Sequence, residues 1–218
     1  MDPRAFAALE ARFGPPRVRE FGSLECLPGE SVMVDRAASR GRNHDVSLWI
    51  PRDGGVVVIR KHSYPRWLFR LPSGAVHDGE AVEEGVKREA KEETGLDVEV
   101  EAYLLRASVT LTYRRTWRPE SPPPPPGAFS RLPAGTHHQP PEEVRVPWVS
   151  HVFRVRATDG PLDPVDKREI ADIRVAGLDE FRTTLRDNLV KAGGGFTFRG
   201  WITDALAESG FLEPRPPT

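Results

Sequence analysis

Cysteine is almost absent from this 218-residue sequence, which contains Cys26 and no second thiol. A lone cysteine excludes an internal disulfide and a zinc site built on several cysteines. Charge of one sign is lacking as well, because 31 Lys and Arg against 32 Asp and Glu leave a net charge of −1. A balance of this kind gives no special case for binding duplex nucleic acid.

A long apolar run is also missing, since no stretch approaches the roughly 20 residues that cross a membrane. The start, MDPRAFAALEARFG, is typical of a short helix and lacks the apolar stretch of a signal peptide. These absences predict a cytoplasmic protein without a membrane partner. At this length the chain can bury one sizeable core with extensions on either side.

What the sequence does have is a helix with acidic residues on its apolar side. Periodicity predicts this helix over residues 81–94, and Glu89 and Glu93 fall on its apolar stripe with Glu92 beside them. An unpaired carboxylate that faces a core costs several kcal/mol, and neighbouring like charges add to that cost. An ordinary surface helix would place these glutamates on the opposite side. The stripe itself is formed by Val82, Val86 and Ala90.

A bound cation would remove the cost of these three carboxylates. Arg88 can pair with one of them, but a single guanidinium cannot neutralise all three. Ligands that are all oxygen favour Mg²⁺ or Mn²⁺ over zinc. Because Mg²⁺ completes its coordination shell with water and substrate phosphates, the helix predicts metal-assisted chemistry on an anionic phosphate substrate.

The spacing of this segment resembles a known family signature. The run GAVHDGEAVEEGVKREAKEETGL, residues 74–96, is similar to the Nudix box GX5EX7REUXEEXGU at every fixed position. The resemblance implies an α/β fold, the Nudix-type α/β/α sandwich with a mixed β-sheet. It also implies a pyrophosphohydrolase that acts on a nucleoside diphosphate linked to another moiety.

Roles for individual residues follow from the same resemblance. Arg88 matches the arginine that orients the glutamates, and Glu80 matches the residue that stabilises the loop. The implied cofactor is Mg²⁺, with Mn²⁺ as the alternative. The implied metal ligands are the Gly74 carbonyl and the carboxylates of Glu89, Glu92 and Glu93.

The implied reaction is attack of water on a phosphorus of the diphosphate, for which metal ions lower the pKa of the water and neutralise charge on the leaving phosphate. The position of the general base varies within the family. Glu92 in the box is one candidate, and Glu143 or Glu169 in a loop is another. The predicted catalytic residues are therefore Glu92, Glu89, Arg88, Glu143 and Glu169.

The chain divides into an N-terminal extension (1–44), a hydrolase domain (45–185) with a proline-rich insert (119–145), and a C-terminal helical extension (186–218) that packs on the domain. The insert contains five consecutive prolines and the pair His137 and His138. Predicted helices cover 5–13 and 196–212, and predicted strands cover 44–50, 55–61, 98–117 as one strand or two, 146–157 and the start of 168–181, with short extended pieces around 18 and 32–34.

The box does not identify the substrate, because the pocket for the base lies outside it. Arg60 and Arg70 are candidate phosphate contacts. Tyr113 lies 17 positions after Leu96, which resembles the tyrosine of enzymes that act on diadenosine polyphosphates, although a tyrosine in a strand is more often ordinary packing. A dinucleoside polyphosphate, ADP-ribose, a sugar nucleotide and a (d)NTP all remain open as substrates.

Two other functions on the same fold compete with hydrolysis. A catalytically silent module that senses or binds a nucleotide often loses box glutamates, whereas this sequence retains them. Isomerisation of a prenyl diphosphate relies on a core cysteine, whereas Cys26 lies well before the box. The two terminal extensions could mediate a homodimer, which is common in the family.

Overall fold

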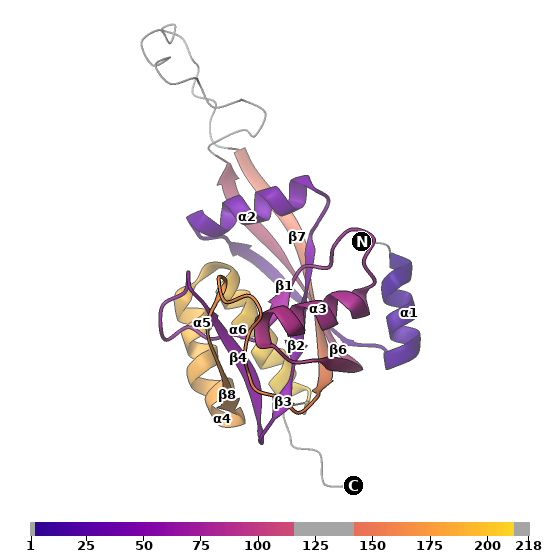
Figure 1. Cartoon of the computed structure of the whole chain (residues 1–218). Helices are drawn as coiled ribbons and strands as arrows, with labels where there is room; N and C mark the ends of the chain where they lie inside the picture. The colour runs from indigo at the N-terminus through magenta and orange to yellow at the C-terminus, as the bar shows by residue number, and fades with distance from the viewer. Residues whose placement is uncertain (1–2, 116–141, 212–218) are drawn as a thin grey trace, which may run out of the picture.

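The computed structural model describes residues 3–115 and 142–211, with side chains from residue 5. Two β-sheets form its centre and helices cover them (Figure 1). The helices and strands in chain order are α1 (Pro3–Phe13), β1 (Arg17–Glu25), α2 (Pro28–Ser39), β2 (His44–Trp49), β3 (Pro51–Arg52), β4 (Gly55–Lys61), β5 (Ser73–Gly74), α3 (Val82–Thr94), β6 (Val98–Arg115), β7 (Glu142–Ala157), β8 (Ile170–Gly177), α4 (Leu178–Glu180), the π-helical turn η2 (Phe181–Leu185), α5 (Arg186–Ala192) and α6 (Gly194–Glu208).

The larger sheet is mixed, as the sequence predicts. Its strand order is β1-β6-β7-β2-β5, with β1 parallel to β6, β2 parallel to β7, and the β6–β7 and β2–β5 pairs antiparallel. The smaller sheet has the order β3-β4-β8. The α/β fold with a mixed sheet is therefore confirmed.

Two apolar cores lie on opposite sides of the strands, because successive side chains of a strand point to opposite faces. In β2, Leu48 belongs to the core that includes Val86 of α3, whereas its neighbour Trp49 belongs to the core that includes Ile202 of α6. Helices α1 and α3 therefore cover one side and α6 covers the other. This layering brings α3 and the neighbouring strand β5 together at the site.

Helix α2 is the main departure from the sequence prediction. The extended conformation predicted around residues 32–34 is wrong, because these residues lie within a helix that begins at Pro28. Proline suits the first helical turn, and the Glu30 carboxylate accepts the Leu27 N–H at 2.9 Å, which satisfies a donor at the helix start. These start signals outweigh the β-branched Val32 and Val34. Figure 1 shows α2 across one end of the large sheet.

The long strand β6 is one element, which settles the choice that the sequence left open. Its partner β7 begins at Glu142, so residues 142–145 belong to a strand and not to the proline-rich insert. The five prolines, His137 and His138 lie outside the described residues.

Both terminal extensions contribute to the body of the molecule. Strand β1 extends the large sheet by parallel pairing with β6, and α6 packs on β1 and β6. The proposed division at residues 45 and 185 stays a prediction. In the described part of the chain, no helix has the length and apolar character needed to cross a membrane.

Candidate active site

Helix α3 positions the acidic residues as its periodicity predicts. Glu89 and Glu93 are 8% and 2% exposed, and they lie among the fully buried Val86 and Ala90. The helix ends at Gly95, whose φ of 79° is left-handed and where a Cβ would come within 2.1 Å of the Asp163 carbonyl oxygen. Glycine is therefore required where the chain leaves the helix and passes close to a neighbouring loop.

Arg88 lies at the centre of a hydrogen-bonded network. Its Nε donates to Glu80 Oε1 at 2.8 Å, and its Nη2 donates to the Ala75 carbonyl at 2.6 Å. Its Nη1 donates to Glu89 Oε1 at 2.9 Å and to Glu92 Oε2 at 3.0 Å. The Arg88 hydrogen bonds hold the pKa of Glu80 below its ordinary value. These contacts are the ones that an arginine orienting the glutamates would make.

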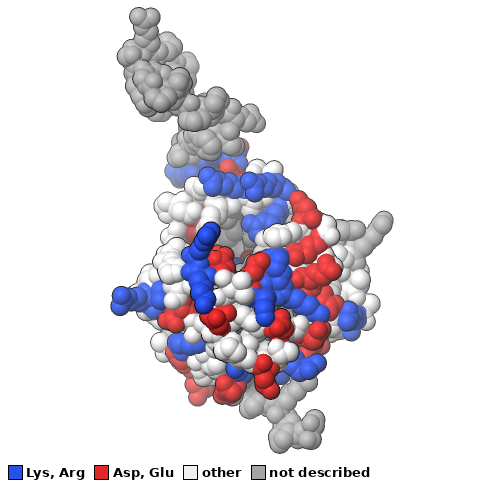
Figure 2. Space-filling model, in the orientation of Figure 1, with Lys and Arg blue, Asp and Glu red and all other residues white. Residues whose placement is uncertain are grey.

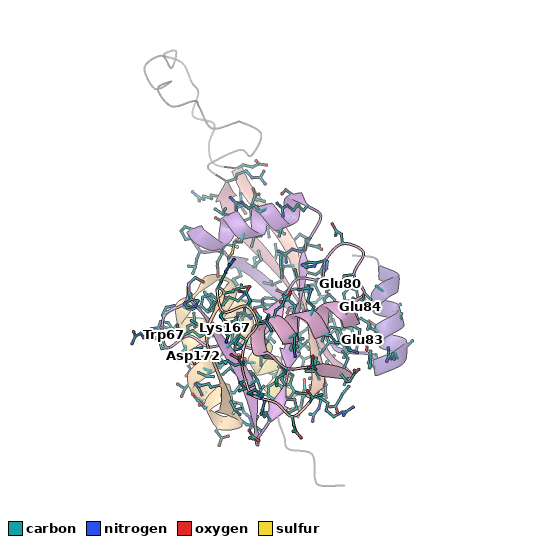
Figure 3. All side chains as sticks on the ribbon, in the orientation of Figure 1. Trp67, Glu80, Glu83, Glu84, Lys167 and Asp172 are labelled. Atoms are coloured by element: carbon teal, nitrogen blue, oxygen red, sulfur yellow. The ribbon has the colours of Figure 1, made fainter. Side chains whose placement is uncertain are left out.

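Glu80 in turn fixes the loop that precedes α3. Its Oε2 accepts the His77 N–H at 2.8 Å, and the same carboxylate receives Arg88 from the helix. Figure 3 shows Glu80 at the start of α3, on the same side of the helix's first turn as Glu84. These contacts are consistent with the loop-stabilising role expected for Glu80.

Glu93 is held by a second set of donors from the strands. Its Oε2 accepts the Ser73 N–H at 2.7 Å, and its Oε1 lies 3.1 Å from Lys61 Nζ and 3.5 Å from Arg70 Nη2. Arg70 also donates to Ser73 Oγ at 2.8 Å, so this serine helps to hold the arginine in place. Lys61 pairs with Glu169 as well, which brings that predicted base to the cluster.

Glu89, in the middle of α3, lies against the backbone of Gly74. A Cβ on Gly74 would lie 1.9 Å from the Glu89 carboxyl carbon, so only glycine admits the carboxylate here. Burial, and then the neighbouring Glu93, raise the pKa of Glu89. A carboxylate whose charged form is disfavoured in this way gains from a cation beside it.

The donor set fits a hard divalent cation. In residues 3–115 and 142–211, no three His, Cys, Asp or Glu side chains are arranged as a metal site. Arg88 engages one oxygen each of Glu89 and Glu92, which leaves the second oxygen of each for another ligand. The available donors are all oxygens, as Mg²⁺ and Mn²⁺ prefer.

A pocket of about 290 Å³ opens beside this cluster. Figure 2 shows the surface hollowed below α2, with Lys and Arg side chains around the opening. The charged end of the pocket is formed by Lys61, Arg70, Ser73 and Gly74, and its aromatic end by Tyr64, Trp148, Phe196 and Phe198. The other wall residues include Cys26, Glu30, Met33, Val34, Arg42, Asp45, Leu111 and Arg199.

Asp45 forms a buried ion pair in the pocket wall that the sequence analysis missed. Its Oδ2 accepts Arg199 Nη2 at 2.7 Å and Trp148 Nε1 at 3.1 Å. Burial alone would raise the pKa of Asp45, but Arg199 and the hydrogen bonds hold that pKa below its ordinary value. The available signal was an acidic residue inside the buried strand HDVSLW and an arginine beside Phe198 in an apolar helix.

The other predicted site residues lie elsewhere. Arg60 is 3.8 Å from Asp172, which Figure 3 shows on the side of Trp67 and away from Glu80. Tyr113 is 5% exposed and donates to Asp35 Oδ1 at 2.5 Å. Burial, and then that hydrogen bond, raise the Tyr113 pKa to about 12.

Glu143 is exposed on the β6–β7 hairpin, where it lies opposite Arg114 and 3.7 Å from Arg145. The structure therefore brings Arg70 and Glu169 to the glutamate cluster, and does not bring Arg60, Tyr113 or Glu143 there.

Cys26 has an unexpected position. Cys26 lies well before the box along the chain, which counts against isomerisation, yet the structure places it in the pocket wall. Burial, and then Glu30 and Glu25, raise the pKa of the thiol to about 11. The group is therefore a protonated thiol at neutral pH and a weak nucleophile.

A family model described as "NUDIX domain" matches residues 41–197. The chain belongs to this family. NUDIX hydrolases generally use divalent metal ions. The chain is 45% identical over 56 residues to an ADP-ribose pyrophosphatase of Methanocaldococcus jannaschii, a match that covers 25% of this chain. It spans about a third (33%) of that relative's length.

Solved structures are similar to this chain at lower identity. A UDP-X diphosphatase is 20% identical with a TM-score of 0.40, and the match covers 70% of this chain and 61% of that one. A MutT NUDIX hydrolase from Burkholderia pseudomallei is 22% identical with a TM-score of 0.38, and the match covers 63% of this chain and 84% of that one.

Proposed function

We propose that this protein is a metal-dependent pyrophosphohydrolase that cleaves the diphosphate linkage of a nucleoside diphosphate derivative. The observation that carries the proposal is the buried Glu89, pressed against the Gly74 backbone at the charged end of a pocket. A buried carboxylate with a raised pKa beside two other glutamates is a costly arrangement that a bound cation makes favourable.

Residues of the box would hold the cofactor. The Gly74 carbonyl and the carboxylates of Glu89, Glu92 and Glu93 are the proposed ligands of Mg²⁺ or Mn²⁺. Such an ion supplies neutralising charge to the diphosphate and lowers the pKa of the attacking water.

The chain's own cations and bases have distinct proposed tasks. Arg88 holds Glu89 and Glu92 in register, which fixes the direction in which their remaining oxygens point. Lys61 and Arg70 line the pocket and present positive charge to the substrate phosphates. Glu169, about half exposed and paired with Lys61, is the proposed acceptor of the proton from water, with Glu92 as the alternative.

The substrate class is supported by the curated relative, which is an ADP-ribose pyrophosphatase. ADP-ribose, sugar nucleotides and dinucleoside polyphosphates all contain a diphosphate that can lie along the charged end of the pocket. The choice among them belongs to the pocket walls outside the box.

A metal-supplemented screen tests the proposal. The protein is incubated with ADP-ribose, dinucleoside polyphosphates, sugar nucleotides and (d)NTPs, with Mg²⁺, Mn²⁺ or EDTA, and products are identified by mass. We expect cleavage of a diphosphate bond that EDTA abolishes. Nucleotide binding without turnover across the whole panel would favour the sensing module instead.

The position of Cys26 in the pocket wall justifies one further arm of the screen, in which a prenyl diphosphate is incubated in deuterated water. Isotope exchange into that compound would favour isomerisation. The cytoplasmic location and the homodimer remain predictions, and mass measurement in solution tests the second.

A further inference from the structure

We infer that Arg199 of α6 is a positioning residue, which fixes the backbone of β5 at the charged end of the site. Arg199 lies outside the box and beyond residues 41–197, which the family model matches. It acts through β2, the strand with which Ser73 and Gly74 are paired. The inference rests on the proposed function in one respect, because the Gly74 carbonyl is a proposed metal ligand.

Strand β5 is the short strand that carries this carbonyl. It consists of Ser73 and Gly74 and lies beside β2 at one edge of the large sheet. Gly74 is paired with Val46 and Ser73 with Ser47, and the Ser73 N–H donates to Glu93 of α3. A segment with so few contacts opens locally unless its neighbour is held in place. The position of the Gly74 carbonyl therefore depends on what holds β2.

Arg199 holds β2 through a buried polar network. Its Nη2 donates to Asp45 Oδ2 at 2.7 Å, and its Nη1 donates to Ser47 Oγ at 2.9 Å. The same Nη1 donates at 3.3 Å to Ser150 Oγ of β7, which lies 3.2 Å from Ser47 Oγ. The two serines and the aspartate are all buried, so water cannot readily replace the guanidinium as their donor.

Ser47 connects this network directly to the site. It is the residue of β2 that pairs with Ser73, and its hydroxyl group accepts the Arg199 guanidinium. Arg199 therefore holds β2 at the point where β5 is attached. The planar fork of an arginine reaches the carboxylate and the serine together, whereas a lysine ammonium has no such fixed geometry.

The helix that carries Arg199 is itself fixed at its start. The Gly195 N–H donates to the Glu30 carboxylate of α2 at 2.9 Å. Gly194 passes so close to this carboxylate that a Cβ on the glycine would collide with it. Arg199 thus reaches the sheet from a helix that is already held, and a preformed support reduces the ordering cost when a ligand binds.

Three variants separate the position of β2 from the charge beside it. Arg199→Lys keeps a cation next to the buried Asp45 and removes the fork, so the fold should be retained. Ser47→Ala leaves the ion pair in place and removes only the hydroxyl group, and it carries the test alone if the lysine variant does not fold. Arg186→Lys is the matched control, because Arg186 of α5 donates to Asp204 of α6 at 2.7 and 2.9 Å.

Amide hydrogen exchange of the full chain, followed by NMR, tests the positioning role without a metal ion. Amides of the β6–β7 pair report global opening and serve as the reference. Relative to them, the Ser73 amide should exchange about fivefold faster in Arg199→Lys and in Ser47→Ala, and at an unchanged rate in Arg186→Lys. If neither Arg199→Lys nor Ser47→Ala changes this ratio, the inference is overturned even where the protein hydrolyses nucleotides.

Titration with Mn²⁺, followed by EPR spectroscopy, tests the consequence for the metal site. Because loss of a group that orients metal ligands typically costs about 10- to 100-fold in affinity, the Kd should rise about tenfold in Arg199→Lys and stay within about twofold in Arg186→Lys. Equal affinity in Arg199→Lys and the unaltered protein would overturn the inference. If the unaltered protein binds no Mn²⁺ while the Ser73 ratio rises in Arg199→Lys, Arg199 still fixes β5 and the proposed function alone fails.

Discussion

The two ends of the pocket differ in what stabilises their side chains. At the charged end, Glu89 and Glu93 are buried and their cost is offset by Arg88, Lys61 and Arg70. At the aromatic end, the rings of Phe196 and Phe198 carry no charge that needs a partner. The position of these rings is instead fixed by a clamp between α2 and α6, in which the Gly195 N–H donates to the Glu30 carboxylate. Ion pairs therefore set the geometry of the charged end, whereas a backbone contact to Glu30 and the hydrogen bond from Trp148 to Asp45 set the shape of the aromatic end.

This contrast predicts that substitutions at the charged end act on rate or on folding, and that substitutions at the aromatic end act on affinity. Substitutions of Glu92 and Glu93 distinguish an effect of charge on rate from an effect of charge on folding. Glu92 is 44% exposed at its side chain, whereas the side chain of Glu93 is 3% exposed and has three donors.

The largest effect is expected for Glu92→Gln. Loss of one ligand charge should reduce kcat about 100- to 1,000-fold, by analogy with the loss of other transition-state contacts. The thermal midpoint should change little because Glu92 is partly exposed. Steady-state kinetics and a melting curve measure both, with Glu84→Gln on the solvent face of α3 as control. Full activity in Glu92→Gln would contradict its assigned role.

Glu93→Gln should act on folding. Removal of this charge leaves Arg70 buried beside a neutral group, and breaking a buried ion pair costs roughly 3–5 kcal/mol. Denaturant unfolding should show that loss in the free energy of unfolding. If the free energy instead falls by less than 1 kcal/mol, the Arg70–Glu93 pair is not the support described here.

Acid should destabilise the protein through His151, a buried histidine of β7 that lies outside the charged end of the pocket. Burial lowers the His151 pKa to about 3, and its Nδ1 is hydrogen-bonded to the Tyr103 hydroxyl group. Below about pH 6.5, His151 binds a proton in the unfolded chain but stays neutral in the folded protein. The contribution of neutral His151 to the free energy of unfolding is therefore fully present above that pH and is lost as the pH falls below it.

The loss is about 1.4 kcal/mol per pH unit, or roughly 3 kcal/mol between pH 6.5 and 4.5. Urea unfolding at several pH values measures it. His151→Gln should flatten the profile. An identical slope in His151→Gln would rule out this histidine as the source.

Glu30→Ala tests the clamp at the aromatic end. It removes the acceptor of the Gly195 and Leu27 N–H groups, which should cost roughly 1–2 kcal/mol of folding free energy, as for other helix-cap changes. The KM should rise while kcat changes less than twofold. Glu20→Ala on the exposed part of β1 is the control, and a fall in kcat without a rise in KM would contradict the contrast.

The smallest effect is expected for Tyr113→Phe. The change removes the hydrogen bond to Asp35, worth roughly 1 kcal/mol. Activity should stay within twofold because the ring is buried away from the pocket wall. A strong rise in KM for a nucleotide substrate would restore the stacking role that its sequence position suggested.

The charged end was predictable because its information is local. Glu89, Arg88 and Gly95 lie within one 13-residue helix and its cap, where a period of 3.6 residues assigns each side chain to a face. The long strands were also predictable from local sequence, because their apolar and polar side chains alternate along the chain. Helix α2 was missed because the β-branched Val32 and Val34 were given more weight than the start signals at Pro28 and Glu30.

The aromatic end was not predictable from local patterns. Trp148, Tyr64 and Phe196 come from a strand, a loop and a helix that only the folded chain brings together. For Tyr113 the prediction failed in the opposite way. Its distance from the box along the chain suggested contact with a base, but that distance does not determine the face of β6 on which the ring lies. The ion pairs of Lys61 with both Glu93 and Glu169 likewise join residues that only the folded chain brings together.

The close approach of Glu30 to Gly194 has a consequence for redesign. A methyl group at position 194 would lie 2.1 Å from Glu30 Oε2, so a side chain at this position requires that the carboxylate move. A change in ligand preference would therefore require that residues 27–30 and 193–195 be exchanged together. Helix α3 and its clustered glutamates can stay unchanged during that exchange.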